Sequence, residues 1–201
     1  LAARQLSAAW GDLPIVQMFH TLGHMKNQVA QAPHEFAPPL RIDSETAIMR
    51  CADRVVAGSP LDKAQMVWLY KADAHTIDVI PPGVDLARFR PIDPLEAKAF
   101  IGVPAGKRMI LFVGRIEPLK GIDTLLRAMK LVAEECGGCE GLTVAIVGGD
   151  ASIPLEQMTG EMARLHQLRA ELGIEELVTF LGKRDQDALP YYYSAAEVVV
   201  M

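Results

Sequence analysis

Short apolar runs rich in β-branched residues alternate along this chain with longer amphipathic stretches. This alternation is typical of parallel strands joined by crossover helices, because each strand is buried on both faces and each helix covers one of those faces. The sequence therefore predicts an α/β fold with parallel sheets. The runs that we expect to be strands are Pro14–Phe19, Arg54–Ala57, Ile77–Ile80, Met109–Val113, Thr143–Val147, Val178–Leu181 and Glu197–Met201.

Several of the helices between these runs are marked in the sequence. Ser59 and Asp93 are each expected to be an N-cap, because each is followed by a proline at the first helical position. Apolar residues three or four positions apart predict a helix with one buried face over 122–133. A second apolar stripe over 162–172 is expected to end at Gly173.

A proline-rich segment divides the chain. The segment from Ile80 to Pro94 contains four prolines, so a strand cannot continue there. We expect an interdomain connection in this segment, with one domain over residues 1–90 and a second over residues 91–201. The two halves share a βα rhythm, as two Rossmann-like domains would.

The composition excludes several classes of protein. With 20 Lys and Arg against 25 Asp and Glu, the net charge is −5, so no nucleic-acid partner is expected and any anion must meet a local basic site. The 3 cysteines favour a reducing compartment, and a cytoplasmic protein is expected. Cys136 and Cys139 have C-x-x-C spacing, but no second ligand pair follows, which favours a plain turn. No apolar run approaches about 18 residues, so we expect no transmembrane segment.

The segment after the run Met109–Val113 carries the strongest binding signal. Gly114 and Arg115 follow the expected strand, and Lys120 lies in the same polar turn before a helix. Ligands of open α/β sheets bind at the carboxyl ends of the strands, so this turn is well placed. A guanidinium and an ammonium near a helix N-terminus suit a diphosphate, although in an arbitrary loop they would be solvated surface charges.

The order strand, Gly-Arg, four residues, Lys-Gly and amphipathic helix resembles the C-terminal domain of retaining glycosyltransferase family 4. That family has the GT-B fold, which pairs two Rossmann-like domains, and its interdomain segment resembles residues 80–91 here. The resemblance implies that Arg115 and Lys120 hold the diphosphate of a nucleotide-sugar donor. The other residues that it places at the donor are Gly114, Gly148, Gly149, Lys183 and Arg184.

A second polar turn follows the run Pro14–Phe19. His20 and Thr21 stand at the end of the expected strand, with Lys26 in the same turn, and a lone histidine there fits a structural role as well as a catalytic one. The family resemblance places His20 near the transferred sugar. Within the family, the chain resembles most the sucrose-phosphate synthase-like members and the inositol-phosphate glycosyltransferase-like members of the mycothiol pathway. In the latter, residues matching Thr21 and Arg41 bind the acceptor phosphate, but Arg41 is equally explained as a salt-bridged residue that opens a helix.

Asp185 and Asp187 have the D-x-D spacing of metal-dependent glycosyltransferases of the other major fold. We expect no metal there, because an apolar helix face follows and Asp185 is better explained as its N-cap. Arg184 has a second interpretation as a surface cation beside these two carboxylates. No G-x-G-x-x-G follows the strand that ends at Gly114, so no nicotinamide cofactor is expected. The resemblance makes the nucleotide-sugar a substrate, and no cofactor is expected beside it.

The resemblance implies metal-independent transfer of a hexosyl group from a nucleotide-diphosphate sugar, in the first place a UDP-sugar, to an acceptor hydroxyl. The anomeric configuration would be kept, and the acceptor would be a phosphorylated sugar or cyclitol. Arg115 and Lys120 would stabilise the charge that grows on the leaving diphosphate.

Two alternatives stay open at this point. Another GT-B enzyme, such as an epimerase or a phosphorylase, would share the crevice, and a non-catalytic nucleotide-sugar-binding fragment would share the donor site. The resemblance marks the chain as an internal fragment with both domains incomplete, because it does not include the family's early glycine-rich loop or the paired glutamates expected beyond Met201. Alone, such a fragment is expected to be inactive. Whether the protein forms a homo-oligomer also stays open.

Overall fold

The structure is a computed structural model, and it describes residues 2–11, 13–30, 33–136, 140–150, 152–154, 157–158 and 160–201. Its contacts divide the chain into two compact units, Leu1–Gly83 and Val84–Met201. The sequence places the domain boundary near residue 91. Both positions fall within residues 80–93, a described segment that contains no helix or strand.

The first unit is built on a parallel sheet in which β1 pairs with β2 and β2 pairs with β3. The first strand is shorter than the apolar run Pro14–Phe19, because only Val16–Met18 pair with the neighbouring strand. The elements of this unit are α1 (Ala2–Ala9), β1 (Val16–Met18), α2 (Gly23–Val29), η1 (Pro33–Glu35), α3 (Pro39–Cys51), β2 (Arg54–Ala57), α4 (Pro60–Tyr70), η2 (Ala74–Thr76) and β3 (Ile77–Val79).

The core of the first unit lies between this sheet and the helices α3 and α4. Val55 and Ala57 of β2 are fully buried, and they belong to one apolar cluster with Met66 and Tyr70 of α4. The expected cap at Ser59 is confirmed, since its hydroxyl accepts the backbone N–H of Asp62 at 3.1 Å. This cluster sets the position of α4 and therefore of the buried Tyr70 side chain.

The second unit contains a parallel sheet with the strand order β6-β5-β4-β7. The order means that the chain crosses over from β4 to β5 and from β5 to β6 through helices, as the alternation in the sequence predicts. The elements are α5 (Pro94–Ile101), β4 (Arg108–Val113), η3 (Pro118–Lys120), α6 (Ile122–Glu135), β5 (Leu142–Val147), α7 (Gly160–Glu171), β6 (Val178–Gly182), α8 (Leu189–Ala195) and β7 (Val198–Val200).

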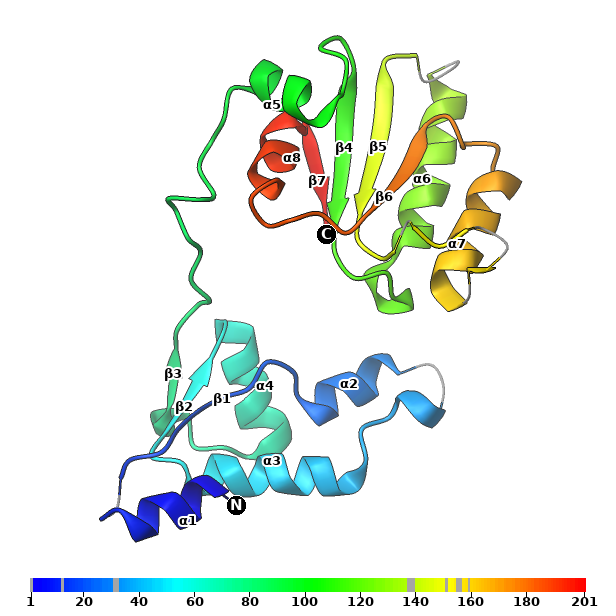
Figure 1. The fold of residues 1–201 in the computed structure, drawn as a ribbon. Coiled ribbons are helices and arrows are strands. Elements are labelled where there is room, and N and C mark those ends of the chain that lie inside the picture. Colours follow the sequence, from blue (N-terminus) through cyan, green and yellow to red (C-terminus); the bar gives the residue numbers. More distant parts are fainter. Residues whose placement is uncertain are drawn as a thin grey trace. The chain divides into compact units, whose positions relative to one another are not determined.

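Helices cover both faces of this second sheet, with α6 and α7 on one side and α5 and α8 on the other (Figure 1). Successive residues of β4 point to opposite faces. Phe112 therefore joins the core under α6 and α7, whereas Met109 and Leu111 join the core under α5 and α8. The sheet is buried on both faces, which explains why its strands read as continuous apolar runs.

The helix signals of the second unit are mostly confirmed. Asp93 caps α5 by accepting the backbone N–H groups of Leu95 and Glu96 at 3.0 Å. Gly173 follows α7 in the left-handed conformation, with φ of 63°. The buried face predicted for 122–133 is found over its first part, where Ile122, Leu125, Leu126 and Met129 are fully or nearly fully buried, whereas Val132 is 37% exposed.

The interpretation of Asp185 as an N-cap is wrong. Helix α8 begins at Leu189, and a turn over residues 186–188 separates it from Asp185. The backbone carbonyl of Asp185 accepts the N–H of Ala188 in that turn, while Pro190 stands in the first helical turn. The helix starts without a side-chain cap, and Pro190 removes one of the N–H groups that would otherwise lack a partner in its first turn.

Two further expectations can be compared with the described part of the chain. Cys136 is a free, exposed cysteine at the end of α6, whereas Cys139 lies outside the described residues. Among the described residues, we find no helix with the length and apolar character needed to cross a bilayer.

Candidate functional site

The carboxyl ends of three strands in the second unit lie level with one another. Val113 of β4 is in register with Val147 of β5, and Val147 is in register with Gly182 of β6. The backbone continues this alignment past the strands, because Gly114 donates to the carbonyl of Val147 and Gly148 donates to the carbonyl of Gly182, both at 3.0 Å. The three loops that carry the predicted donor residues therefore leave the sheet side by side.

Gly148 and Gly149 are required by packing within this edge. Gly148 has a φ of 145°, and a Cβ atom there would lie 1.9 Å from the carbonyl oxygen of Gly114. Gly149 has a φ of 67°, and its Cβ would lie 2.8 Å from Cγ1 of Ile116. The family resemblance places these two glycines at the donor. The structure adds a reason inside the protein, namely the close approach of two neighbouring loops.

Arg115 and Lys120 lie in the loop that follows β4. The Arg115 side chain is 77% exposed and its NH1 lies 2.9 Å from Oε1 of Glu117. Lys120 is exposed at the end of η3, directly before the left-handed Gly121 and helix α6. An exposed ion pair of this kind contributes at most about 1 kcal/mol, so Arg115 can exchange Glu117 for another anion at little cost.

Lys183 and Arg184 leave the carboxyl end of β6. Nε of Arg184 donates to the hydroxyl of Tyr192 at 2.9 Å, which holds the guanidinium against α8. Lys183 faces Asp150 in the loop after β5. The pKa of Asp150 is lowered, chiefly because Ser152 donates hydrogen bonds to its carboxylate and to a smaller extent by the charge of Lys183.

The two aspartates with D-x-D spacing also have structural surroundings. Asp187 forms an ion pair with Arg88 at 3.0 Å, and Arg88 also donates to the side chain of Gln186 at 2.9 Å. These contacts join the segment that opens the second unit to the loop after β6. Among the residues described, no three His, Cys, Asp or Glu side chains gather as a metal site requires.

Thr21 and Arg41 of the first unit lie in direct contact. NH2 of Arg41 donates to both the carbonyl and the hydroxyl oxygen of Thr21, each at 2.9 Å. Nε of Arg41 donates to Oε1 of Glu45 at 2.8 Å, so Arg41 is also the salt-bridged residue in the first turn of α3 that the sequence allowed. His20 is exposed in the turn after β1, whereas Lys26 lies in helix α2 and not in that turn, contrary to the expectation from the sequence. No hydrogen bond or ion pair joins either side chain to Thr21 or Arg41.

Glu45 is the buried centre of this contact. It is only 6% exposed, and its Oε2 accepts the backbone N–H of Gly23 at 2.9 Å and the hydroxyl of Tyr70 at 2.6 Å. Burial by itself raises the pKa of Glu45, but the hydrogen bonds from Tyr70, Arg41 and Gly23 outweigh it, so the pKa lies below its ordinary value. Glu45 is therefore an ionised carboxylate inside the protein.

Tyr70 completes the network from α4. Its hydroxyl accepts the backbone N–H of His24 at 3.0 Å while it donates to Glu45. Burial and the hydrogen bond to Glu45 raise the pKa of Tyr70 to about 12. The sequence shows Glu45 four residues after Arg41, but Tyr70 lies 25 residues further along the chain, and no local pattern links it to the turn.

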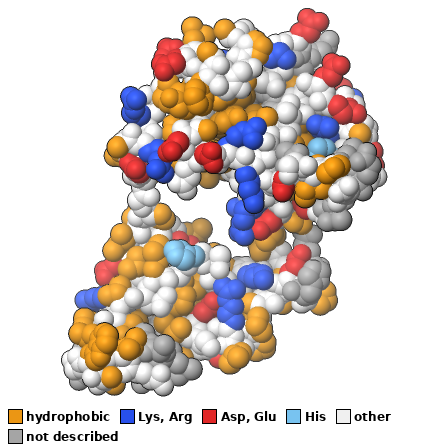
Figure 2. Space-filling model, viewed as in Figure 1, with side chains coloured by type: hydrophobic (Ala, Val, Ile, Leu, Met, Phe, Trp, Pro, Cys, Tyr) orange, Lys and Arg blue, Asp and Glu red, His pale blue; other side chains and the backbone are white. Residues whose placement is uncertain are grey.

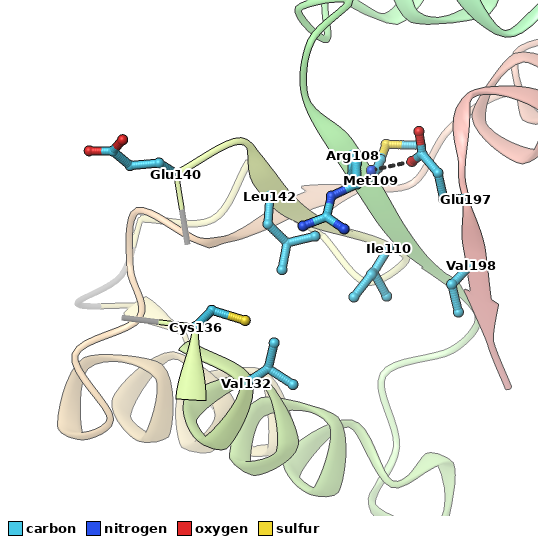
Figure 3. Close-up of a pocket in the computed structure, with 9 residues that line it drawn as sticks. All are labelled: Arg108, Met109, Ile110, Val132, Cys136, Glu140, Leu142, Glu197 and Val198. Atoms are coloured by element: carbon cyan, nitrogen blue, oxygen red, sulfur yellow. Dashed lines mark hydrogen bonds between the residues drawn. The ribbon is translucent and has the colours of Figure 1, made fainter. Parts of the chain in front are cut away.

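A hollow of about 270 Å³ lies at the opposite edge of the second sheet, where β4, β5 and β7 begin (Figure 3). Glu197 in its wall is engaged by the protein, because it accepts hydrogen bonds from the backbone of Met109 and from Lys98. None of the predicted donor residues lines this hollow. Its walls are formed by Arg108, Met109, Ile110, Val132, Cys136, Glu140, Leu142, Glu197 and Val198.

The charges on the surface are mixed. On the face drawn in Figure 2, acidic and basic side chains are interspersed in both units. This distribution fits the modest net charge of −5 and offers no broad basic surface on that face. Positive charge on this face is therefore local rather than spread over a broad surface.

Comparison with known proteins finds two family models along the chain. Residues 95–201 match the model described as Glycosyl transferases group 1. Residues 1–88 match the model described as Glycosyltransferase Family 4.

Curated relatives of this chain are also named as glycosyltransferases. The chain is 39% identical over 193 residues to D-inositol 3-phosphate glycosyltransferase 2 of Catenulispora acidiphila, a match that covers 96% of this chain and 44% of the relative. It is also 39% identical over 201 residues to D-inositol 3-phosphate glycosyltransferase of Mycolicibacterium vanbaalenii, covering 98% of this chain and 43% of that protein. The chain thus spans less than half the length of these relatives.

Solved structures confirm the fold. Sucrose-phosphate synthase from Thermosynechococcus elongatus matches with a TM-score of 0.78 and 31% identity, over 98% of this chain and 46% of that one. Anabaena HepE in complex with UDP and glucose matches with a TM-score of 0.71 and 24% identity, over 98% of this chain and 48% of that one. The predicted α/β fold with parallel sheets of the GT-B type is confirmed.

Proposed function

The chain belongs to glycosyltransferase family 4, and on that premise we propose that its protein moves a hexosyl group from a nucleotide-diphosphate sugar to a hydroxyl of a phosphorylated acceptor. We further propose that the anomeric configuration is kept and that no metal ion takes part. The second unit would bind the donor and the first unit would bind the acceptor. A uridine nucleotide is the first donor to test.

One observation carries the donor side of this proposal. The strands β4, β5 and β6 end level, so the loops with Arg115, Lys120, Lys183 and Arg184 leave one edge of one sheet. Ligands of open parallel sheets bind at this edge. A diphosphate carries its charge over two neighbouring groups, and cations from the two loops that flank the β5 loop suit it better than a single basic residue.

Arg115 and Lys120 would act on the leaving group. When the bond between the anomeric carbon and the diphosphate oxygen breaks, negative charge on the diphosphate increases. Cations at fixed positions then stabilise the transition state more than the bound substrate. The exposed pair between Arg115 and Glu117 is compatible with this role, because the diphosphate can replace a weakly bound carboxylate.

Retention of configuration can occur without an enzymic nucleophile. The acceptor oxygen would form its bond to the anomeric carbon on the face from which the diphosphate leaves. The acceptor's proton would pass to an oxygen of the departing diphosphate, so that the products are a glycoside and a nucleoside diphosphate. His20, at the carboxyl end of β1, is proposed to lie near the transferred sugar.

The acceptor side of the proposal rests on Thr21 and Arg41. The names of the curated relatives specify an inositol phosphate as acceptor, and the contact between Thr21 and Arg41 joins a hydroxyl and a guanidinium that both suit a phosphate group. Lys26, exposed on helix α2, is proposed to add positive charge to this side.

The proposal is tested by measuring nucleotide release in the full-length protein. UDP-glucose should yield free UDP when D-inositol 3-phosphate is added and much less without an acceptor. Arg115→Ala and Lys120→Ala should each lower turnover at least about 100-fold, the scale of losing one donor to a developing anion. Arg127→Ala, at an exposed arginine of α6, is the matched control and should retain the normal rate.

Three outcomes would contradict the proposal. Equal UDP release with and without an acceptor would indicate a different reaction, such as epimerisation with leakage or hydrolysis. UDP binding without any turnover would favour a non-catalytic binding protein. Near-normal turnover in both Arg115→Ala and Lys120→Ala would remove these residues from the reaction.

A further inference from the structure

The phosphate-binding role proposed for Arg41 and Thr21 depends on how these side chains are held. We propose that Glu45 is a positioning residue, which orients Arg41 so that Arg41 and Thr21 together bind the phosphate of the acceptor. This inference rests on the proposed function and adds to it the group that makes the acceptor site selective for a phosphorylated molecule.

Glu45 uses both of its oxygen atoms to organise the turn. Oε1 accepts Nε–H of Arg41 at 2.8 Å, and Oε2 accepts the backbone N–H of Gly23 at 2.9 Å and the hydroxyl of Tyr70 at 2.6 Å. The three donors come from α3, from the start of α2 and from the end of α4. One buried carboxylate therefore ties three helices together at the point where Arg41 emerges.

The contact with Glu45 orients the guanidinium of Arg41. A guanidinium is planar and presents its N–H groups in fixed directions, so a bond at Nε limits where NH1 and NH2 can lie. NH2 is directed to Thr21, where it donates to both the carbonyl and the hydroxyl oxygen. Among the described residues, NH1 has no hydrogen-bond partner, although the Arg41 side chain is only 35% exposed.

Thr21 is left with a donor of its own. Its hydroxyl oxygen accepts from Arg41, and a hydroxyl that accepts one bond keeps its proton available to donate. Within the described part of the chain, the Thr21 hydroxyl donates to no other group. NH1 of Arg41 and the Thr21 hydroxyl are thus two open donors linked through NH2 of Arg41, which lies 2.9 Å from the hydroxyl oxygen. Two such donors match two oxygen atoms of one phosphate.

The negative charge of Glu45 does not prevent Arg41 from binding a phosphate. Tyr70 and the Gly23 amide share the hydrogen bonding of the carboxylate, and Tyr70 remains a donor because its pKa is raised to about 12. Gly23 also has no room for a side chain, since a Cβ would lie 2.9 Å from Cγ1 of Ile42 and 3.1 Å from Oε2 of Glu45. Packing therefore holds Glu45 at the Nε side of Arg41, away from the open NH1.

The chain provides a matched control for this ion pair. Lys130 and Glu134 have the same i,i+4 spacing on α6, but their side chains are 37% and 58% exposed. Glu45 differs by its burial and by its contacts with Gly23 and Tyr70. An effect of Glu45→Gln that Glu134→Gln does not share therefore comes from the buried network rather than from the loss of one helical charge pair.

The test compares two acceptors in the full-length protein. Initial rates are measured with D-inositol 3-phosphate and with unphosphorylated myo-inositol, at saturating UDP-glucose. Glu45→Gln should raise KM for the phosphorylated acceptor about tenfold and change kcat less than about threefold, because the amide cannot orient Arg41 as the carboxylate does. The preference in kcat/KM for the phosphorylated acceptor should fall about tenfold. Glu134→Gln should leave both values unchanged.

A second variant and a binding measurement keep the inference testable. Tyr70→Phe removes one donor to Glu45 but leaves its charge, and it should lower the same preference by about threefold. If the wild-type protein transfers sugar to no phosphorylated acceptor, the proposed function fails. Calorimetric titration with D-inositol 3-phosphate then decides on Glu45 alone, with a Kd about tenfold higher in Glu45→Gln than in wild type.

Two results would overturn the role of Glu45. One is a Glu45→Gln variant that folds normally and keeps the full preference for the phosphorylated acceptor. The other is an equal loss with both acceptors, which would mean that Glu45 supports only the structure of the first unit. In either case, acceptor-dependent UDP release by the wild type would leave the proposed function standing.

Discussion

Arg41 in the first unit and Arg115 in the second are both proposed to bind an anion, but their surroundings differ. Arg41 is held by the buried Glu45 and by two bonds to Thr21. Arg115 is 77% exposed and pairs with Glu117, two residues further along the same loop. One guanidinium is held by a buried carboxylate, whereas the other forms only an exposed ion pair.

This difference suggests how binding energy would be used in the two units. A fixed guanidinium loses little conformational freedom on binding, so it favours one group in one geometry. A mobile guanidinium loses more, but it can follow a diphosphate whose charge grows during the reaction. We therefore expect changes at Arg41 and its partners to affect stability as well as selectivity, and changes at Arg115 to affect turnover alone.

The difference between the two arginines concerns their side chains only, because the backbone at the carboxyl ends of the second-unit strands is tightly packed. The largest effect that we predict comes from disturbing this backbone. Gly148→Ala would place a methyl group 1.9 Å from the carbonyl oxygen of Gly114 at a positive φ. We expect a loss of about 3 kcal/mol or more in the free energy of unfolding, measured by urea denaturation. Gly106→Ala is the control, since nothing lies within 4 Å of its Cβ, and it should cost nothing measurable. Equal stability of both variants would show that the edge is loosely built.

A pair of tyrosines tests the comparison directly. Tyr70→Phe removes the donor to buried Glu45 and the acceptor of the His24 amide, so it should cost about 1–3 kcal/mol of unfolding free energy. Tyr192→Phe makes the same chemical change in the second unit, where the hydroxyl accepts from the exposed Arg184. It should cost less than about 1 kcal/mol, because Arg184 can turn to water. Comparable losses in urea denaturation would erase the difference between the two units.

The smallest predicted effect concerns pH. The pKa of Glu45 is below the usual value of 4.5 in the folded protein, so the stability it contributes is present above that value and is lost as pH falls through the lower folded pKa. Glu197 in the second unit shifts in the same direction: burial opposes the shift, but hydrogen bonds from Lys98 and the Met109 amide outweigh it. Glu45→Gln should therefore reduce, without abolishing, the decline of unfolding free energy between about pH 5 and pH 3. An unchanged decline would show that Glu45 is not held ionised.

Much of the fold follows from local patterns in the sequence. The strands of the second sheet are continuous apolar runs because both faces are buried, and the caps at Ser59 and Asp93 depend on residues only two or three positions away. The cap assigned to Asp185 failed for a related reason. An aspartate before an apolar helix face fits a cap, but the intervening turn delays the helix to Leu189, and that turn has no strong signal of its own.

The candidate site was predictable in part. Arg115 and Lys120 stand in the polar turn after a predicted strand, which a short-range pattern locates, but the family resemblance was needed to interpret them and to single out Thr21 and Arg41. The contact between Arg41 and Thr21, and the role of Tyr70, depend on how α2, α3 and α4 pack, and the sequence does not encode those distances locally. The sequence also did not show why position 148 must be a glycine, because the atom that leaves no room for a side chain is the carbonyl oxygen of Gly114 in another loop.

The most direct test of the donor site is a crystal structure of the full-length protein with UDP bound. We predict that oxygen atoms of the diphosphate lie within about 3.2 Å of the side-chain nitrogens of Arg115 and Lys120, with Glu117 displaced from Arg115. A diphosphate bound in the hollow beside Arg108 at the other edge of the sheet, or one that leaves the pair between Arg115 and Glu117 intact, would contradict the proposed donor site.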